Sequence, residues 1–220
     1  MIESIIKVKG DILTSLGQTF FMVAISVAIG IVFGTIIGLI LYTTSTSYFV
    51  KNKFVNRTIG VLINIIQSVP FLILMVLLLP LSKIIVGTKI GSKAVLVPLS
   101  IAAISFFARL SEASFSDVSK GVIEAFISTG ASKFKVIAKI LIPEALPSLL
   151  RNITVTTVSI LGFSAMAGLV GGGGLGDLAY RYGYQRYQSE IMIICVLILI
   201  VLVQGIQAFG EWSVKKVSKK

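Results

Sequence analysis

The sequence predicts an all-α integral membrane protein with five transmembrane helices. Three observations point to this fold class. Of the 220 residues, 55% are hydrophobic and only 13% are charged. The mean hydropathy of +0.99 is far too high for a soluble domain. The apolar residues also form five long runs that contain no Asp, Glu, Lys, Arg or His. Because the bilayer offers the backbone no hydrogen-bond partners, each run is expected to be helical.

The five runs are expected to form one membrane domain that occupies residues 1–220. The third run is the shortest and is bounded by Lys93 and Arg109, whose long stems can reach the lipid headgroups. For this run, a re-entrant segment that does not fully cross is the alternative. The predicted spans are residues 20–42, 58–81, 94–108, 152–170 and 191–209.

The distribution of basic residues predicts how the chain is oriented in the plasma membrane. Thirteen of the twenty Lys and Arg residues lie on segments that are cytoplasmic if the N-terminus is outside. Cytoplasmic segments carry the excess of Lys and Arg, so the sequence favours an outside N-terminus, an inside C-terminus and a cytoplasmic segment at residues 109–151. The net charge of +11 is then typical of flanks that face anionic lipid, and nucleic acid is not an expected partner.

Gly30, Gly34 and Gly38 repeat every four residues along the first span. Glycines at this spacing remove the side chains from one stripe of a helix, so that a neighbouring helix can approach closely. We therefore predict that these three positions serve helix packing.

The spans hold no charged group that would couple transport to protons or sodium ions. Such carriers usually keep an ionisable or densely polar site near mid-membrane, so the energy for transport is expected to come from outside the chain. The residues predicted to line a translocation pathway or gate are Asn64, Gln67, Phe163, Ser164 and Met166. Hydrogen bonding between helices is the alternative for the three polar residues, and ordinary packing is the alternative for Phe163 and Met166.

A run rich in glycine at residues 171–176 formally matches the dinucleotide fingerprint G-x-G-x-x-G. That fingerprint requires a preceding strand, whereas a membrane span precedes it here. We therefore expect a flexible or tightly turned loop there, with no bound cofactor. The chain has no His and one Cys, so no metal site is predicted, nor is any catalytic residue.

The cytoplasmic segment carries the most specific motif of the chain. Glu124, Ala125, Gly130, Ile140 and Pro143 follow the spacing E-A-A-x(3)-G-x(9)-I-x-L-P. This spacing resembles the signature of the permease subunits of bacterial ABC importers. Two positions depart from it, because Phe126 replaces the third signature residue and Ile142 replaces the leucine.

The resemblance implies that this segment forms a short helix, a turn and a second helix that dock into a groove on a cytoplasmic ATPase subunit. The small residues Ala125, Gly130 and Ala131 would permit a close approach, and Gly130 would break the helix. The residues implied to contact the ATPase are Glu124, Ala125, Gly130, Ala131, Ile140 and Pro143. A generic solvated amphipathic loop is the alternative.

The likeness extends to Val69-Pro70-Phe71, Ser164-Ala165-Met166 and Tyr182-Gly183-Tyr184, and over nearly its whole length the chain is similar to methionine-uptake permeases. The resemblance implies a homodimer that moves methionine inward with two ATPase subunits, which use ATP and Mg²⁺, and an external substrate-binding protein. The chain itself would bind no cofactor and catalyse no reaction. The alternatives are an ABC permease for another small amino acid or osmolyte, and an ATPase-independent secondary carrier.

Overall fold

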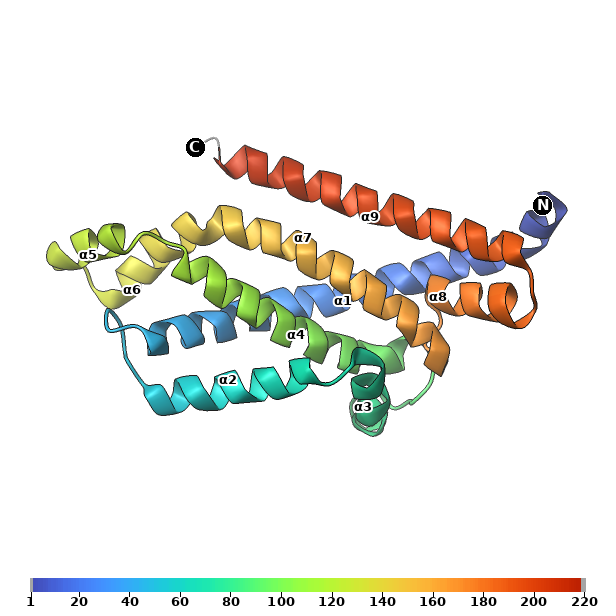
Figure 1. The fold of residues 1–220 in the computed structure, drawn as a ribbon, viewed down its shortest axis with the longest axis horizontal. Helices are drawn as coiled ribbons and strands as arrows, with labels where there is room; N and C mark the ends of the chain where they lie inside the picture. The colour runs from blue at the N-terminus through green and yellow to red at the C-terminus, as the bar shows by residue number, and fades with distance from the viewer. Residues whose placement is uncertain (1, 219–220) are drawn as a thin grey trace.

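The computed structural model describes the backbone of residues 2–218 and the side chains of residues 8–218. The described chain is built from helices joined by short connections (Figure 1). In chain order the α-helices are α1 (Ile2–Ser45), α2 (Lys53–Ser68), α3 (Phe71–Val86), α4 (Ser92–Ser116), α5 (Lys120–Ser128), α6 (Lys133–Val136), α7 (Ile142–Ala167), α8 (Gly174–Leu178) and α9 (Ser189–Ser218).

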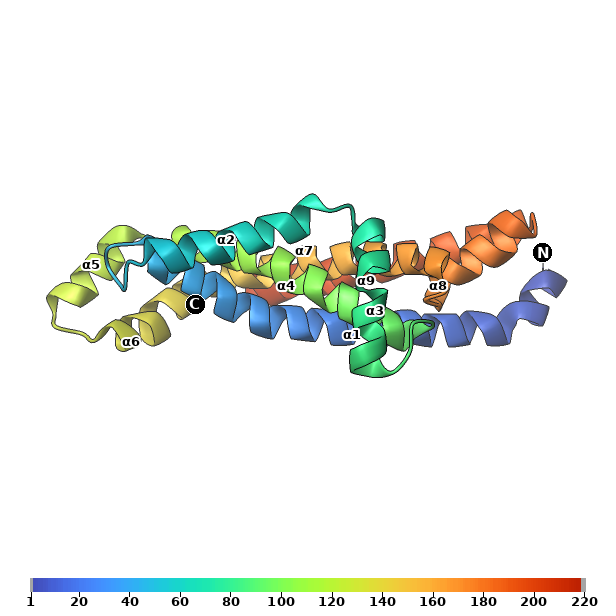
Figure 2. The ribbon, with the colours of Figure 1, turned by 90° about the horizontal axis from the view of Figure 1, so that it is seen from below.

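Among the residues that the structure describes, four helical segments are long and apolar enough to cross a membrane: Val8–Ser45 of α1, α4, α9 and the continuous stretch Lys133–Val170 that contains α7. The bent pair α2 and α3 makes a fifth if it is taken as one span. All four run roughly along the long axis of the molecule (Figures 1 and 2). Helix α1 begins at one end of this axis, and α9 ends toward the other. One end carries α5, α6 and the connection from α1 to α2, and the other carries α8 and the start of α9.

The predicted span 58–81 is not one continuous helix. It is divided into α2 and α3, whose axes differ by 110°. Pro70 lacks the backbone N–H that would continue α2, and it restricts Val69 before it to an extended conformation with φ −87° and ψ 126°. As a result α2 runs beside the long helices, while α3 lies across them (Figure 2).

The other predicted boundaries also shift. The third span was expected at residues 94–108, but α4 has 25 residues and extends to Ser116, so Arg109 lies inside a helix. The segment expected at residues 109–151 is shorter outside the long helices, because α7 begins at Ile142. The first helix begins well before the predicted residue 20.

The glycine stripe of α1 lies against α4 of the same chain. A Cβ atom added at Gly30 would stand 2.6 Å from the Ala103 Cβ, and one added at Gly38 would stand 2.7 Å from the Ala108 carbonyl oxygen. At Gly34 the nearest atom would be the Phe107 Cβ, at 3.0 Å. The two helices are therefore in backbone contact along the stripe, and α1 and α4 form the centre of the fold.

Gly38→Leu is expected to lower stability sharply, because the added side chain meets the α4 backbone and cannot be accommodated by a rotamer change. Overpacking of this kind typically costs about 1–3 kcal/mol or more. Thermal unfolding of the detergent-solubilised protein measures the effect. Gly17→Leu, in the same helix and with nothing within 4 Å of its added Cβ, is the control. Equal melting of the two variants would contradict the packing role of the stripe.

Candidate functional site

A short helix, a turn and a second helix project from one end of the molecule. Gly130, in the turn, has φ +78°, a left-handed conformation that favours glycine. The Ser132 side chain caps α6 by accepting a hydrogen bond from the backbone N–H of Lys135 at 3.4 Å. A π-helical turn at Ile137–Leu141 then joins α6 to α7. The second helix of this unit is therefore continuous with a membrane-spanning helix.

One side of this unit packs against the membrane helices, and its other side is exposed. Ile123 of α5 and Val136 of α6 are fully buried in a hydrophobic cluster with residues of α1, α4 and α7. Of the residues implied to contact an ATPase, Glu124, Ala125, Gly130 and Pro143 are exposed, whereas Ala131 and Ile140 are half-buried.

Two aromatic side chains add to the exposed surface of this unit. Phe126 is 43% exposed and Phe134 is 77% exposed. Phe126, which departs from the signature, finds room by facing outward. Phe134 was missed by the sequence reasoning, because its neighbours Lys133 and Lys135 make it look like part of a solvated helix. After the ATPase contact that the resemblance implies, we call the following exposed residues together the docking face: Glu124, Ala125, Phe126, Gly130, Phe134 and Pro143. Apolar groups exposed at a polar end of a membrane protein are typical of a binding surface.

The docking face is tied to the connection between α1 and α2. The Tyr48 hydroxyl donates a hydrogen bond of 2.5 Å to a carboxylate oxygen of Glu124. This hydrogen bond, together with the nearby carboxylate charge, raises the pKa of Tyr48 above its ordinary value. Lys133 donates from Nζ to the Phe49 carbonyl oxygen at 2.8 Å.

A second feature, inside the span region, is a pocket of about 640 Å³ at the break between α2 and α3, walled by α4 and α7. The rings of Phe163 and Phe71 stack there with centroids 4.4 Å apart. Gln67 donates from Nε2 to the Ser105 carbonyl oxygen at 3.0 Å. The pocket therefore combines an aromatic wall with amide and hydroxyl groups, and it contains two of the predicted pathway residues, Phe163 and Gln67.

Arg109 of α4 closes one side of this pocket. Its guanidinium donates to the Gly60 carbonyl oxygen at 2.9 Å and to the Asn64 Oδ1 atom at 2.6 Å, both on α2. It also pairs with Glu112 at 2.8 Å. Asn64, a predicted pathway residue, is thus engaged by this guanidinium. The sequence reasoning assigned Arg109 only to the membrane flank and missed its role as a link between helices.

The two remaining pathway residues lie elsewhere. Ser164 is buried and its hydroxyl donates to the Leu161 carbonyl oxygen at 2.7 Å. Met166 is 45% exposed. It shares an outward face of α7 with Val155, Ser159 and Gly162, which precede it at helical spacing. The structure therefore separates Phe163, which packs within the chain, from Met166, which faces out of it.

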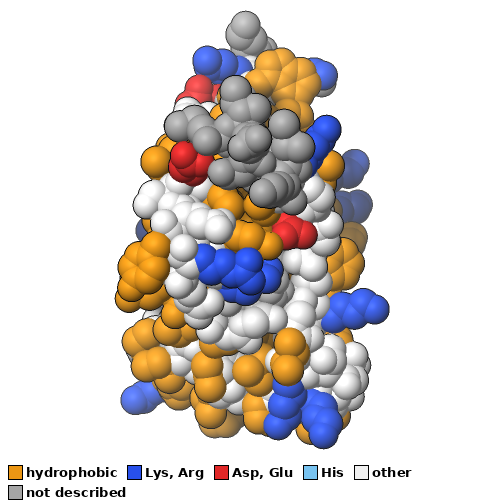
Figure 3. Space-filling view, turned by 90° about the vertical axis from the view of Figure 1, so that its right-hand side faces the viewer, with side chains coloured by type: hydrophobic (Ala, Val, Ile, Leu, Met, Phe, Trp, Pro, Cys, Tyr) orange, Lys and Arg blue, Asp and Glu red, His pale blue; other side chains and the backbone are white. Residues whose placement is uncertain are grey.

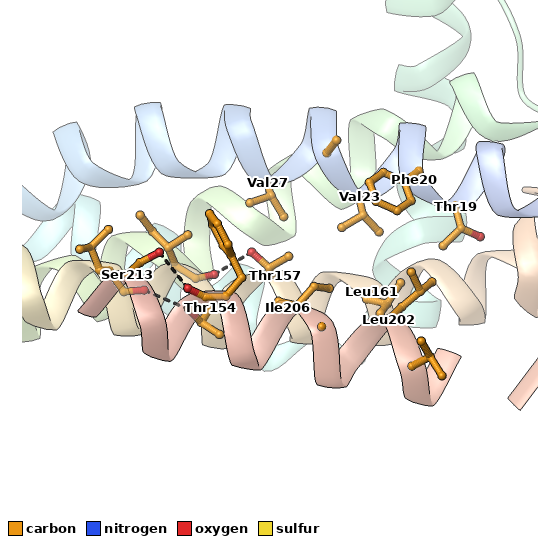
Figure 4. Close-up of a pocket in the computed structure, with 17 residues that line it drawn as sticks. Thr19, Phe20, Val23, Val27, Thr154, Thr157, Leu161, Leu202, Ile206 and Ser213 are labelled. Atoms are coloured by element: carbon orange, nitrogen blue, oxygen red, sulfur yellow. Dashed lines mark hydrogen bonds between the residues drawn. The ribbon is translucent and has the colours of Figure 1, made fainter. Parts of the chain in front are cut away.

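A second cavity, a groove of about 500 Å³ between α1, α7 and α9, is lined mainly by apolar side chains (Figure 4). The hydroxyls of Thr154, Thr157 and Ser213 donate to carbonyl oxygens of their own helices. Thr19 accepts a hydrogen bond from the backbone N–H of Leu175. With its hydroxyls occupied and its remaining wall apolar, this groove suits hydrocarbon rather than a zwitterion.

The glycine-rich run is a tight turn rather than a flexible loop. Gly171, Gly173 and Gly174 have positive φ angles of 75°, 76° and 85°. The backbone N–H of Gly174 donates to the Gln18 side-chain oxygen at 2.8 Å, which fixes the start of α8 against α1. Figure 3 faces this end of the molecule, where Lys and Arg side chains are scattered over a largely uncharged surface.

Comparisons with known proteins agree with this architecture. The family described as "Binding-protein-dependent transport system inner membrane component" matches residues 30–219. A probable D-methionine transport system permease protein of Vibrio cholerae is 49% identical over 209 residues, which cover 95% of this chain and 93% of that protein. A methionine import system permease protein of Bacillus subtilis is 41% identical over 181 residues, with 82% of each chain covered.

A solved structure gives the same result for the fold. Inward-facing conformations of a methionine ABC transporter include a chain that matches with a TM-score of 0.93 and 37% identity, covering 96% of this chain and 98% of that one. The predicted all-helical ABC-importer permease fold is confirmed. The chain belongs to the family of binding-protein-dependent transport system inner membrane components.

Proposed function

We propose that this chain is the membrane-spanning subunit of an ATP-driven importer that carries methionine across the plasma membrane. The observation that carries the proposal is the docking face, an exposed helix–turn–helix unit continuous with the membrane-spanning α7. A partner that moves this unit moves a membrane helix directly. Coupled transport requires a site for the ATPase, a separate pathway for the substrate and a rigid element that connects them.

The partner at the docking face is a cytoplasmic ATPase subunit. The face presents Phe126 and Phe134, with Lys120, Lys135 and Lys139 exposed around them. A complementary partner therefore offers an apolar groove with an acidic rim. The partner hydrolyses ATP with Mg²⁺, while this chain binds no cofactor and catalyses no bond chemistry. Its contribution is to bind the ATPase and to change shape.

The position of the basic residues and of α5 and α6 at one end of the molecule also indicates the orientation of the chain. Basic residues gather at the end with α5, α6 and the C-terminus, so this end faces the cytoplasm and the N-terminus lies outside. On the outer side of the membrane, the extracytoplasmic binding protein delivers the substrate. Two copies of the chain assemble around a two-fold axis. The outward face of α7 that carries Met166 lines the route along this axis and helps to close it.

Methionine is the substrate that the pocket and the relatives favour. The relatives from Vibrio cholerae and Bacillus subtilis are named as methionine permeases. In this chain, the stacked rings of Phe71 and Phe163 offer a thioether favourable sulfur–aromatic contacts. An apolar wall separates similar side chains by only about 1–3 kcal/mol. The binding protein therefore supplies most of the selectivity, and another small amino acid is the second candidate.

Uptake of labelled methionine tests the proposal. A strain from which this gene is deleted is expected to lose high-affinity uptake, and the restored gene should return it. Uptake should stop when ATP is depleted while the proton gradient is held. Unlabelled methionine should compete better than other small amino acids or osmolytes. Uptake that persists without ATP would assign the chain to secondary carriers and would overturn the proposal.

A further inference from the structure

We propose that the connection between α1 and α2, residues 46–52, is a second relay that carries movement of the docking face into the membrane, with Tyr48 as its positioning residue. This inference rests on the proposed function, since it takes α5 to be the site of ATPase contact. It adds a route distinct from the continuous helix α6–α7.

The relay touches both helices of the docking face. Tyr48 donates to Glu124 of α5 at 2.5 Å, and the Phe49 carbonyl oxygen accepts from Lys133 of α6 at 2.8 Å. Figures 1 and 2, which view the molecule from directions 90° apart, both place the connection at the end that carries α5 and α6. The carboxylate of Glu124, which the family resemblance implies to be at the ATPase contact, is therefore also held from within the chain.

Phe49 locks the relay to the same hydrophobic cluster that anchors the docking face. Its side chain is 5% exposed and packs in one cluster with Ile123 of α5 and Val136 of α6. Its ring also lies against Tyr42 of α1, with centroids 6.0 Å apart. A displacement of α5 that left the relay in place would break this packing as well as the hydrogen bond from Tyr48 to Glu124.

Beyond Phe49, the relay is fixed to the helices on either side of it. The Asn52 backbone N–H donates to the Thr44 carbonyl oxygen at 3.0 Å, and its side chain caps α2 by accepting from Val55 at 3.1 Å. Asn56 of α2 donates to the Leu41 carbonyl oxygen at 2.7 Å. The end of α1 and the start of α2 therefore move together with the relay.

The far end of α2 reaches the pocket at the α2–α3 break. Asn64 of α2 is held by Arg109, and Gln67 lines the pocket. A shift of α5 is thus passed through Tyr48 and Phe49 to α2, and from α2 to the pocket wall. The turn at Gly130 lets α5 and α6 move differently, because it is the break between them. The relay gives α5 its own connection to the membrane helices.

Tyr48→Phe tests the relay by removing one hydroxyl group. The variant is assembled with the ATPase subunits and binding protein in proteoliposomes, and ATP hydrolysis and methionine uptake are measured together. ATPase binding is expected to be unchanged, while the ATP hydrolysed per methionine rises roughly fivefold or more, the lower end of common coupling factors. Tyr184→Phe, at an exposed tyrosine in the π-helical turn that follows α8, should leave this ratio as in the wild type.

A double-mutant cycle gives a readout that a loss of folding would not produce. In a Glu124→Ala background, Tyr48→Phe should have no additional effect on the ratio, because its partner is already absent. An unchanged ratio in Tyr48→Phe, or two independent effects that multiply in the double variant, would overturn the relay while leaving the proposed function intact. A wild-type chain that binds no ATPase would overturn the proposed function, and the relay with it.

Discussion

Gly130→Trp is expected to abolish methionine uptake while the chain still folds and inserts. Gly130 has φ +78°, and an L-residue in this conformation costs about 1–2 kcal/mol. Nothing lies within 4 Å of an added Cβ there, so the indole extends into the space that the ATPase must occupy. The backbone cost is within the range that a folded membrane protein tolerates, but the bulk in the docking face prevents close approach of the partner.

Gly87→Trp is the matched control for this variant. Gly87 has φ +80° and also has nothing within 4 Å of an added Cβ, but it ends α3 and lies outside the docking face. The two variants therefore share the backbone cost and differ in position. Co-purification of the ATPase subunit and uptake of labelled methionine should both be lost with Gly130→Trp and both be retained with Gly87→Trp. Normal uptake by Gly130→Trp would remove the docking face from the mechanism.

The helix–turn–helix that carries the docking face was predictable because its signature is local. The spacing from Glu124 to Pro143 encodes a helix, a turn and a helix, and each of these depends on residues within one or two turns of chain. The glycine in the turn was itself a signal, since the left-handed conformation at Gly130 needs it. Which side of α5 faces outward was not predictable, because it is fixed by the burial of Ile123 against three other helices.

The bend between α2 and α3 was missed for a different reason. Hydropathy reports that a run of residues prefers lipid, but not the direction in which the helix points. The signal was present in Val69-Pro70, since proline ends one helix and can start another. Within a run of uniform hydropathy this signal was not used, and residues 58–81 were predicted as one span.

Helical spacing alone did not predict which of the pathway residues are buried and which face outward. Phe163 and Met166 are three positions apart and were expected on one helical face, yet Phe163 stacks on Phe71 and Met166 faces outward. Three residues advance an α-helix by about 300°, which leaves the two side chains about 60° apart around the axis. The edge of the buried face falls between them, so one packs inside and the other faces outward. Only the position of α3, which supplies Phe71, decides between these environments.

Arg109 was missed because its partners are distant in sequence. Gly60 and Asn64 lie 49 and 45 positions away, and a basic residue at the end of an apolar run is usually a membrane flank. The link matters because α2 has few other polar contacts with α4. The Arg109 guanidinium binds the Gly60 carbonyl oxygen, and the Gln67 amide binds the Ser105 carbonyl oxygen further along α2.

Arg109→Met is expected to lower methionine uptake about tenfold or more, while leaving ATPase binding unchanged. Methionine keeps the apolar stem of arginine, so the packing of α4 is retained. The variant loses the hydrogen bonds to Gly60 and Asn64, and such charge-assisted bonds contribute roughly 1.5–3 kcal/mol each when well shielded. With 31% of the Arg109 side chain exposed, solvent screening places their value toward the lower end.

Two further variants separate this positioning role from a loss of charge. Arg109→Lys keeps the charge but presents a point donor rather than a fork, so it cannot hold both acceptors and should restore uptake only in part. Arg57→Met, which removes an exposed positive charge from α2 itself, should leave uptake near the wild-type rate. Thermal unfolding of each purified variant establishes that the chain is folded. Wild-type uptake by a folded Arg109→Met protein would show that α2 holds its place at the pocket without the guanidinium.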